Sequence, residues 1–192
     1  YYDRHYKITQ AEVQAFMAMF DYNENGAVPN ANYDESMISQ SIKEWPAHGN
    51  FANQSYYLAP FYDADGDGTY NYQNGDYPYY DFDNALCPRT LKAALKPGQA
   101  YVPATTMEDS AGIVHGGLLT DQVLKGDQTI WWVFNDMGNT HTESQGQPIG
   151  LEIRAQAFAF STNDEINNMS FYSYEIINRS TYELRNTYFS QW

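Results

Sequence analysis

The stretch "DADGDGTYNYQNGDYP", residues 63–78, combines residue types and spacing that could support metal chemistry. Aspartates recur at every second position from Asp63 to Asp67, and Gly68 follows the last of them. This order fits the calcium-loop pattern D-x-[DN]-x-[DN]-G, in which alternate residues of a turning loop point oxygen atoms at one centre. Three converging carboxylates would repel one another without a cation between them. The pattern therefore predicts a Ca²⁺ site with the ligands Asp63, Asp65, Asp67, Thr69, Asn71, Asn74 and Asp76.

The twelfth position of this loop leaves two alternatives open. Asn74 stands where calcium loops usually have a bidentate glutamate, and Asp76 could supply the missing carboxylate instead. A polar Asp-Gly turn without a metal is the competing interpretation. Since Pro60 and Pro78 flank the loop and neither side has a helical pattern, we expect a structural clamp and not a helix-loop-helix sensor.

A second polar stretch, "NDMGNTHTE", could be another cation site or a loop closed by side-chain hydrogen bonds. Its candidate residues are Asn135, Asp136, His141 and Glu143. The four histidines, His5, His48, His115 and His141, form no HxxxH or HExxH pattern, so they are predicted to be structural.

Catalysis has little support in the sequence, and we predict no enzymatic activity. Paired carboxylates could hydrolyse glycosides, but no spacing selects a pair among Asp127, Asp136, Glu143 and Glu152. No G-x-S-x-G motif occurs. Cys87 is the only cysteine, which excludes an intrachain disulfide, and we interpret it as a small buried residue.

The acidic region is also rich in tyrosine, which can either pack or bind sugars. Of the 18 tyrosines in the chain, seven crowd this region: Tyr56, Tyr57, Tyr70, Tyr72, Tyr77, Tyr79 and Tyr80. Packing around the loop is favoured over a sugar-binding face.

The net charge of −14 over 192 residues limits the possible partners. It argues against nucleic acid, which needs a basic patch, and against anionic membrane surfaces. No apolar run approaches the roughly 20 residues of a membrane span, so we expect no membrane insertion. The acidity fits a protein that binds cations or works outside the cell.

Two helices and a β-rich region are expected to position these residues. Thr9 and Glu12 form a capping box before the helical spacing of Val13, Phe16, Met17 and Phe20, and Asn25-Gly26 and Pro29 end that helix. A second short helix is expected over "ESMISQSIKEW", with Met37, Ile38, Ser41, Ile42 and Trp45 on one side.

From residue 127 the pattern changes to strands. "QTIWWVF", "IGLEIRAQAFAF", "MSFYSYEIIN" and "YELRNTYFSQW" are predicted strands, with "NRST" as the turn between the last two. The fold class is mainly β: an antiparallel, sandwich-like sheet with a short helical N-terminal part and a long calcium-binding loop. We divide the chain into a helical lead-in (1–50), the acidic loop region (51–90), an irregular insertion (91–126) and the β region (127–192), all within one domain or part of one.

Several of these segments together resemble a known group of proteins. "WPAHGN", "LAPFYDADGDGTYNYQNGDYP", "GDQTIWWVFNDMGNTHTE", "PIGLEIRAQAFAF", "NNMSFYSYEIINRS" and "NTYFSQW" are similar to stretches of large secreted surface proteins of Bacteroidota that the type IX secretion system exports. The resemblance covers most of the chain except roughly residues 79–125. The sequence departs from this family at Asn74, where an aspartate is usual.

The resemblance implies an extracellular or cell-surface address, a removed signal peptide and a distant C-terminal sorting domain, so we expect the chain to be a mature piece of something longer. It carries no established activity. Asp109-Ser110-Ala111 fits the three-residue O-glycosylation pattern of secreted Bacteroidota proteins, which makes Ser110 a candidate glycan site. We expect a calcium-stabilised structural or adhesive module whose partners are other protein modules, surface assemblies or glycans. The alternative is a carbohydrate-active module, either sugar-binding or hydrolytic.

Overall fold

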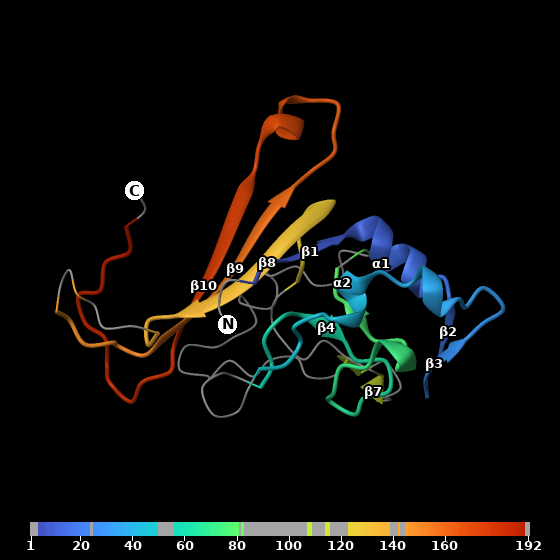
Figure 1. Cartoon of the computed structure of the whole chain (residues 1–192), viewed down its shortest axis with the longest axis horizontal. Coiled ribbons are helices and arrows are strands. Elements are labelled where there is room, and N and C mark those ends of the chain that lie inside the picture. The colour runs from blue at the N-terminus through green and yellow to red at the C-terminus, as the bar shows by residue number, and fades with distance from the viewer. Residues whose placement is uncertain are drawn as a thin grey trace.

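The computed structural model describes residues 4–23, 25–49, 56–80, 82, 107–108, 114–115, 123–138, 142 and 145–190. These residues form a mainly β structure whose paired strands are all antiparallel, as expected. Figure 1 shows the largest sheet on one side of the molecule, with the two α-helices and the β2–β3 hairpin on the other.

The main sheet has four strands in the order β1-β8-β9-β10. Three of them are predicted strands: β8 (Gln128–Asn135), β9 (Leu151–Ala159) and β10 (Phe171–Asn178). The fourth strand was predicted at "YELRNTYFSQW", but residues 179–190 contain no strand. The fourth strand of the sheet is instead β1 (Tyr6–Thr9), which pairs with β8 at the edge opposite β10.

The first helix begins as predicted and ends earlier. Thr9 caps α1 (Gln10–Met17), and the capping box with Glu12 is present. The chain then forms a hairpin of β2 (Phe20–Asn23) and β3 (Gly26–Pro29), so that Phe20 reaches the core from a strand and not from the helix. The Asn-Gly signal near residue 25 therefore marks a hairpin turn and not a helix end.

The second predicted helix is divided into the 3₁₀ turn η1 (Glu35–Met37) and the short helix α2 (Gln40–Lys43). Ile38, Ile42 and Trp45 are buried, whereas Met37 is 71% exposed. The prediction that Met37 lies on the same side as these residues was wrong because Ile38 has an extended backbone, which breaks the helical phase between Met37 and Ile42.

The other elements are short. They are β4 (Phe61–Tyr62), η2 (Tyr72–Asn74), β5 (Tyr77–Pro78), β6 (Met107–Glu108), β7 (Val114–His115) and η3 (Glu165–Asn168). Apart from the main sheet, every sheet within the described residues has two strands. The sandwich, which needs a second large sheet against the first, therefore stays a prediction.

The two faces of the main sheet differ in what covers them. Trp131 and its cross-strand neighbour Gln156 lie on the face that packs against the rest of the molecule, and both are buried. On the other face, Ala155 is buried because Trp132 and Tyr174 flank it from the neighbouring strands, with ring centroids 6.4 Å apart. Trp131 and Trp132 thus point to opposite faces, as successive residues of a strand do.

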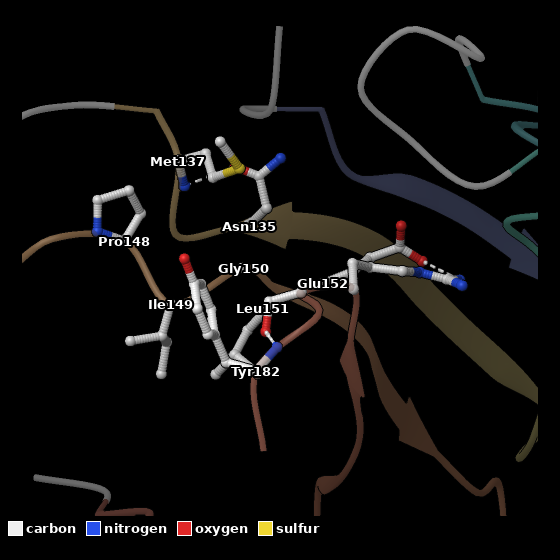
Figure 2. A pocket seen from close by; sticks show the side chains of 10 residues that line it. Asn135, Met137, Pro148, Ile149, Gly150, Leu151, Glu152 and Tyr182 are labelled. Carbon is white, nitrogen blue, oxygen red and sulfur yellow. Dashed lines mark hydrogen bonds and ion pairs between the residues drawn. The ribbon is translucent and has the colours of Figure 1, made fainter. Parts of the chain in front are cut away.

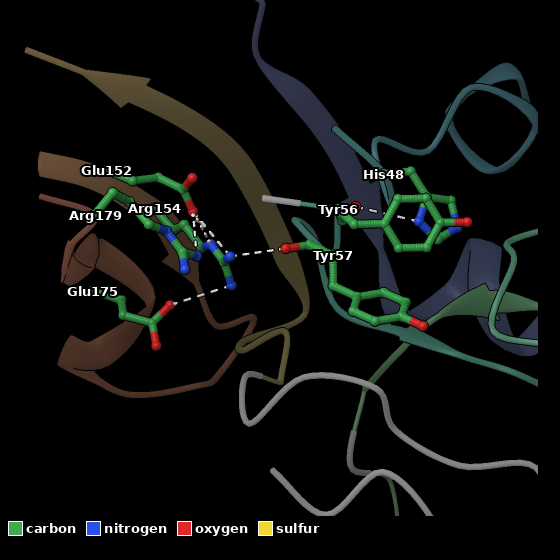
Figure 3. A network of polar contacts seen from close by, with 7 residues as sticks. All are labelled: His48, Tyr56, Tyr57, Glu152, Arg154, Glu175 and Arg179. Carbon is green, nitrogen blue, oxygen red and sulfur yellow. Dashed lines mark hydrogen bonds and ion pairs between the residues drawn. The ribbon is translucent and has the colours of Figure 1, made fainter. Parts of the chain in front are cut away.

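A buried ion-pair network on the packed face ties the sheet to the segment that leads into the acidic loop. Arg154 contacts Glu152 at 2.9 Å and Glu175 at 3.6 Å, and its Nη2 donates to the Tyr57 carbonyl at 2.8 Å (Figure 3). Glu152 and Arg154 of this strand are thus both buried. Burying these charges is favourable only because each of them has a partner.

No helix in the described part of the chain combines the length and the apolar character that crossing a membrane requires.

Candidate metal centre

The acidic loop is closed at its base by a short antiparallel ladder. Phe61 pairs with Pro78 and Tyr62 with Tyr77, so that residues 63–76 form the connection between β4 and β5. The Tyr62 and Tyr77 rings stack at a centroid distance of 4.9 Å. Strands and not helices therefore flank the loop, in agreement with the expectation that it is not a helix-loop-helix motif.

Three aspartates of the loop converge. Asp63, Asp65 and Asp67 each place a carboxylate oxygen within 4.8 Å of the others, which forms a group that could hold a metal ion. Asp63 is buried at 1% exposure, whereas the other two are exposed. The alternating spacing read from the sequence thus does bring these three side chains together.

Local hydrogen bonds hold the carboxylates in this arrangement. Asp63 accepts the Gly66 and Gly68 N–H groups, both at 2.8 Å, one on each carboxylate oxygen. Asp65 accepts the N–H of Asp67 at 3.2 Å. Gly66 and Gly68 have φ angles of 74° and 78°, a left-handed conformation that glycine adopts without steric cost. The loop is therefore shaped by its own backbone.

Asp76 lies next to this group but has a different set of contacts. Its two oxygens accept the N–H groups of Ala64 at 2.8 Å and Asn71 at 2.7 Å, and its side chain is fully buried. Burial raises the pKa of Asp76 to about 7, although the two backbone donors oppose the shift. Burial likewise raises the pKa of Asp63. A cation close to these buried carboxylates would favour their charged forms.

The other predicted ligands have mixed positions. Asn74 donates its side-chain N–H to Asp65 at 2.7 Å, which places its amide beside the aspartate group. The Asn71 side chain caps η2 by accepting the Gln73 N–H at 3.1 Å, and the Thr69 N–H donates to Asp67 at 2.6 Å. Asn74 therefore contacts the aspartate group directly, whereas the Asp76 carboxylate bonds to the loop backbone. Their ligation stays a prediction.

The loop is anchored to the helical part of the chain. Tyr22 on β2 donates to the Gly75 carbonyl at 2.8 Å, and Tyr70 donates to the Ile42 carbonyl at 2.7 Å. A Cβ atom added to Gly75 would lie 2.4 Å from the Ala27 Cβ. The loop thus packs directly on the β2–β3 hairpin and hydrogen-bonds to α2.

The residues around the loop pack instead of forming an open aromatic face. Tyr77, Tyr79 and Tyr80 belong to the buried core, and Tyr57, Tyr70 and Tyr72 pack against it. His48, which the sequence marked only as structural, has a definite role: its Nε2 accepts the Tyr70 N–H at 2.7 Å, and its ring stacks on Tyr56 (Figure 3). The contact of the "WPAHGN" segment with the loop was not predicted.

The loop that begins at Asn135 shows one of its two predicted arrangements in part. Asp136 accepts the backbone N–H groups of Ile149, Gly150 and Leu151, which closes the loop by side-chain hydrogen bonds. His141 and Glu143 lie outside the described residues, so the predicted cation site stays untested.

The glycosidase candidates that the structure describes also have structural contacts. Asp127 accepts the Ser161 N–H at 2.6 Å, and Glu152 belongs to the buried ion-pair network.

Three other predicted residues cannot be compared with the structure: Cys87, Ser110 and the side chain of His115 lie outside the described residues. His5 packs on Trp132 at a centroid distance of 5.4 Å.

Comparisons with known proteins give no family for this chain: no protein-family model matches it, and neither a curated protein nor a solved structure does. The site is therefore defined by its geometry alone, as an aspartate group that could hold a metal ion.

Proposed function

We propose that this protein is a calcium-stabilised structural module of an extracellular or cell-surface protein, in which the acidic loop acts as a clamp and not as a catalyst. The observation that carries the proposal is the convergence of Asp63, Asp65 and Asp67 in a loop that its own backbone already shapes. A preformed loop loses little conformational entropy when it takes up an ion.

The ligand chemistry favours calcium among the metals. The group offers carboxylate oxygens, with amide and carbonyl oxygens of Asn71, Asn74 and Thr69 in the same loop. Oxygen-only sets suit hard cations, and an irregular loop suits the flexible coordination of Ca²⁺ better than the octahedral geometry of Mg²⁺. Asp76 would complete the set if its carboxylate turned from a backbone donor toward the ion.

The position of the loop supports a role as a clamp. One side of it contacts β2 and α2 through Tyr22 and Tyr70. Its flanking segments contact the main sheet, where Tyr57 accepts from Arg154 and Tyr80 donates to the Ile8 carbonyl at 3.3 Å. An ion bound in the loop would therefore stabilise the join between the helical part and the sheet, because the unfolded chain lacks the site.

The main sheet supports contacts with neighbouring modules. Its outer face carries Tyr172, Tyr174 and Ile176, which are 57%, 40% and 44% exposed. Antiparallel sheets that carry apolar side chains on both faces are normally covered on both. A second β layer over this face would complete the predicted sandwich, and a neighbouring module could supply it. An extracellular address agrees with the acidic composition and with the sequence resemblance to exported surface proteins of Bacteroidota.

Calorimetric unfolding with saturating Ca²⁺ or with EDTA tests the clamp. At a Ca²⁺ concentration about 100 times the Kd, we expect the melting temperature to rise by about 5–10 °C. Mg²⁺ at the same concentration should have a smaller effect. Equal melting temperatures in Ca²⁺ and in EDTA would remove the clamp from the proposal.

A further inference from the structure

A pocket lies where β8 ends and β9 begins, separate from the aspartate group. Its volume is about 250 Å³. Figure 2 shows that Met137, Pro148, Ile149 and Tyr182 surround it, with Leu151 and Glu152 on the strand beneath. Arg179 and Ser180, which follow β10, line it from the neighbouring segment.

Hydrogen bonds within the protein fix the walls of this pocket. Asp136 holds the N–H groups of residues 149–151, and Arg179 donates its backbone N–H to the Gly150 carbonyl at 2.8 Å. Gly150 has a φ of 78°, and a Cβ atom there would lie 2.8 Å from the Ser180 Cβ, so only glycine permits this close approach. Preformed concave sites of this kind are typical of small-molecule binding.

The two charged side chains of the pocket are unequally accessible. The Glu152 side chain is 7% exposed and the Arg179 side chain is 48% exposed, so an incoming molecule meets the cation first. Glu152 has Arg154 as its closer partner, at 2.9 Å against 3.3 Å for Arg179. When Arg179 turns toward a ligand, Glu152 keeps Arg154 as its partner. Glu175, which shares Arg154, is 30% exposed and stays partly solvated.

We propose that this pocket binds a small organic carboxylate. The carboxylate pairs with the Arg179 guanidinium, whose planar fork of N–H donors matches carboxylate geometry. The apolar part of the ligand lies against Met137, Ile149 and Leu151. The volume is below the roughly 300–1,000 Å³ of pockets for drug-sized molecules, so the ligand is a short acid and not a large one.

This chemistry could come from a free acid or from the C-terminus of a peptide that ends in an apolar residue. Both offer a carboxylate next to an apolar group. The proposal does not depend on the metal centre, so its failure would leave the calcium clamp untouched.

Titration of the protein with hexanoate, followed by NMR of the Met137 and Ile149 methyl groups, tests the site. We expect saturable shifts of these two methyl signals. Hexanamide, which has the same tail without the charge, should bind at least about tenfold more weakly. A peptide acid with a C-terminal leucine, compared with its amide, forms the second arm: tighter binding than hexanoate identifies a chain terminus as the source, and weaker binding identifies a free acid.

The variant Arg179→Gln should lower hexanoate affinity about tenfold or more and leave hexanamide affinity unchanged. Arg185→Gln is the matched control, since Arg185 is an exposed arginine outside the pocket that pairs with Glu183. Met137→Ser, at a side chain that is 67% exposed, should weaken both ligands without unfolding the protein. The proposal is overturned if hexanoate causes no methyl shifts, if hexanamide binds equally well, or if Arg185→Gln has the same effect as Arg179→Gln.

Discussion

The aspartates of the acidic loop have different environments although the sequence presents them as equals. Asp63 and Asp76 are buried, and each accepts two backbone N–H groups. Asp65 and Asp67 are exposed, and each accepts the N–H of the residue two positions on. Buried carboxylates must have such donors, whereas exposed ones can exchange them for an ion. We therefore expect Asp65 and Asp67 to affect metal affinity with little effect on folding.

The variant Asp67→Asn tests this expectation. Asparagine keeps an oxygen that can accept the Thr69 N–H, so the turn should persist while one negative charge is lost. Since Ca²⁺ affinity depends on the number of charged ligands, we expect a Kd at least about tenfold higher. Isothermal titration calorimetry measures it, and the melting temperature in EDTA should not fall.

Glu183→Gln is the control, because Glu183 is an exposed carboxylate that pairs with Arg185 outside the loop. An equal loss of affinity in both variants would mean that general surface charge, and not the loop, attracts the ion.

His48 gives a pH dependence of known sign. Burial lowers the pKa of His48 in the folded protein, although the Tyr56 carbonyl opposes the shift. The unfolded chain therefore binds a proton more readily than the folded one. The contribution of His48 to stability is complete above pH about 6.5 and is lost as the pH falls from there through the folded pKa.

The variant His48→Gln isolates this effect, because glutamine can accept the Tyr70 N–H and does not titrate. Urea unfolding in EDTA across acidic pH should show wild-type stability falling relative to the variant below pH about 6.5. Asp63 and Asp76, whose raised pKa values act in the opposite direction, are present in both proteins and cancel in the difference. A constant difference across this range would contradict the prediction.

At the scale of single residues, the sequence could predict which aspartates converge but not which contacts each of them makes. The spacing of Asp63, Asp65 and Asp67 predicted their convergence, because alternate residues of a turning loop point toward one centre. The contrast between Asn74 and Asp76 could not be predicted, since it depends on which side chain meets the Ala64 and Asn71 N–H groups. The role of His48 depends on a contact 22 residues away.

Two glycines of the acidic loop are needed for different physical reasons. Gly75 and Gly66 both have positive φ angles, 92° and 74°, but their surroundings differ. A Cβ at Gly75 would lie 2.4 Å from the Ala27 Cβ on β3, whereas a Cβ at Gly66 would have nothing within 4 Å. The comparison separates backbone strain from packing against the hairpin.

We expect Gly66→Ala to lower the free energy of unfolding by about 1–2 kcal/mol, the cost of a left-handed conformation. Gly75→Ala should cost clearly more, because it adds a clash with β3 that the hairpin must move to relieve. Chemical denaturation of both variants in EDTA measures the two values. Equal losses would mean that the hairpin moves away freely and that the loop is not packed firmly on it.

Element prediction succeeded where local pattern and tertiary packing agree. The capping box at Thr9 and the β-branched and aromatic runs of β8 and β10 predicted elements that are present. It failed at β1 and at residues 182–190. Tyr6 and Ile8 become a strand through pairing with β8, a partner more than 100 residues away, and the pattern near Tyr188 finds no such partner among the described strands.

At the scale of the whole molecule, the main sheet has one face packed on the core and one apolar face that is partly exposed. The packed face carries the Arg154 network, while the outer face carries aromatic side chains of β8 and β10. Contiguous exposed apolar patches on soluble proteins commonly mark interaction surfaces. This is the whole-molecule feature that supports a role as one module among others.

The outer face should therefore cause the isolated chain to associate at high concentration. We expect sedimentation equilibrium to show concentration-dependent association that the triple variant Tyr172→Ser, Tyr174→Ser, Ile176→Thr abolishes, because it removes the exposed apolar side chains of β10. A control variant, Val28→Ser, Met37→Ser, Met169→Ser, replaces three exposed apolar side chains outside β10 and should associate like the wild type. Far-UV circular dichroism must show that both variants remain folded. If the wild type is monomeric throughout, or if the control variant loses association equally, the outer face is not an interaction surface.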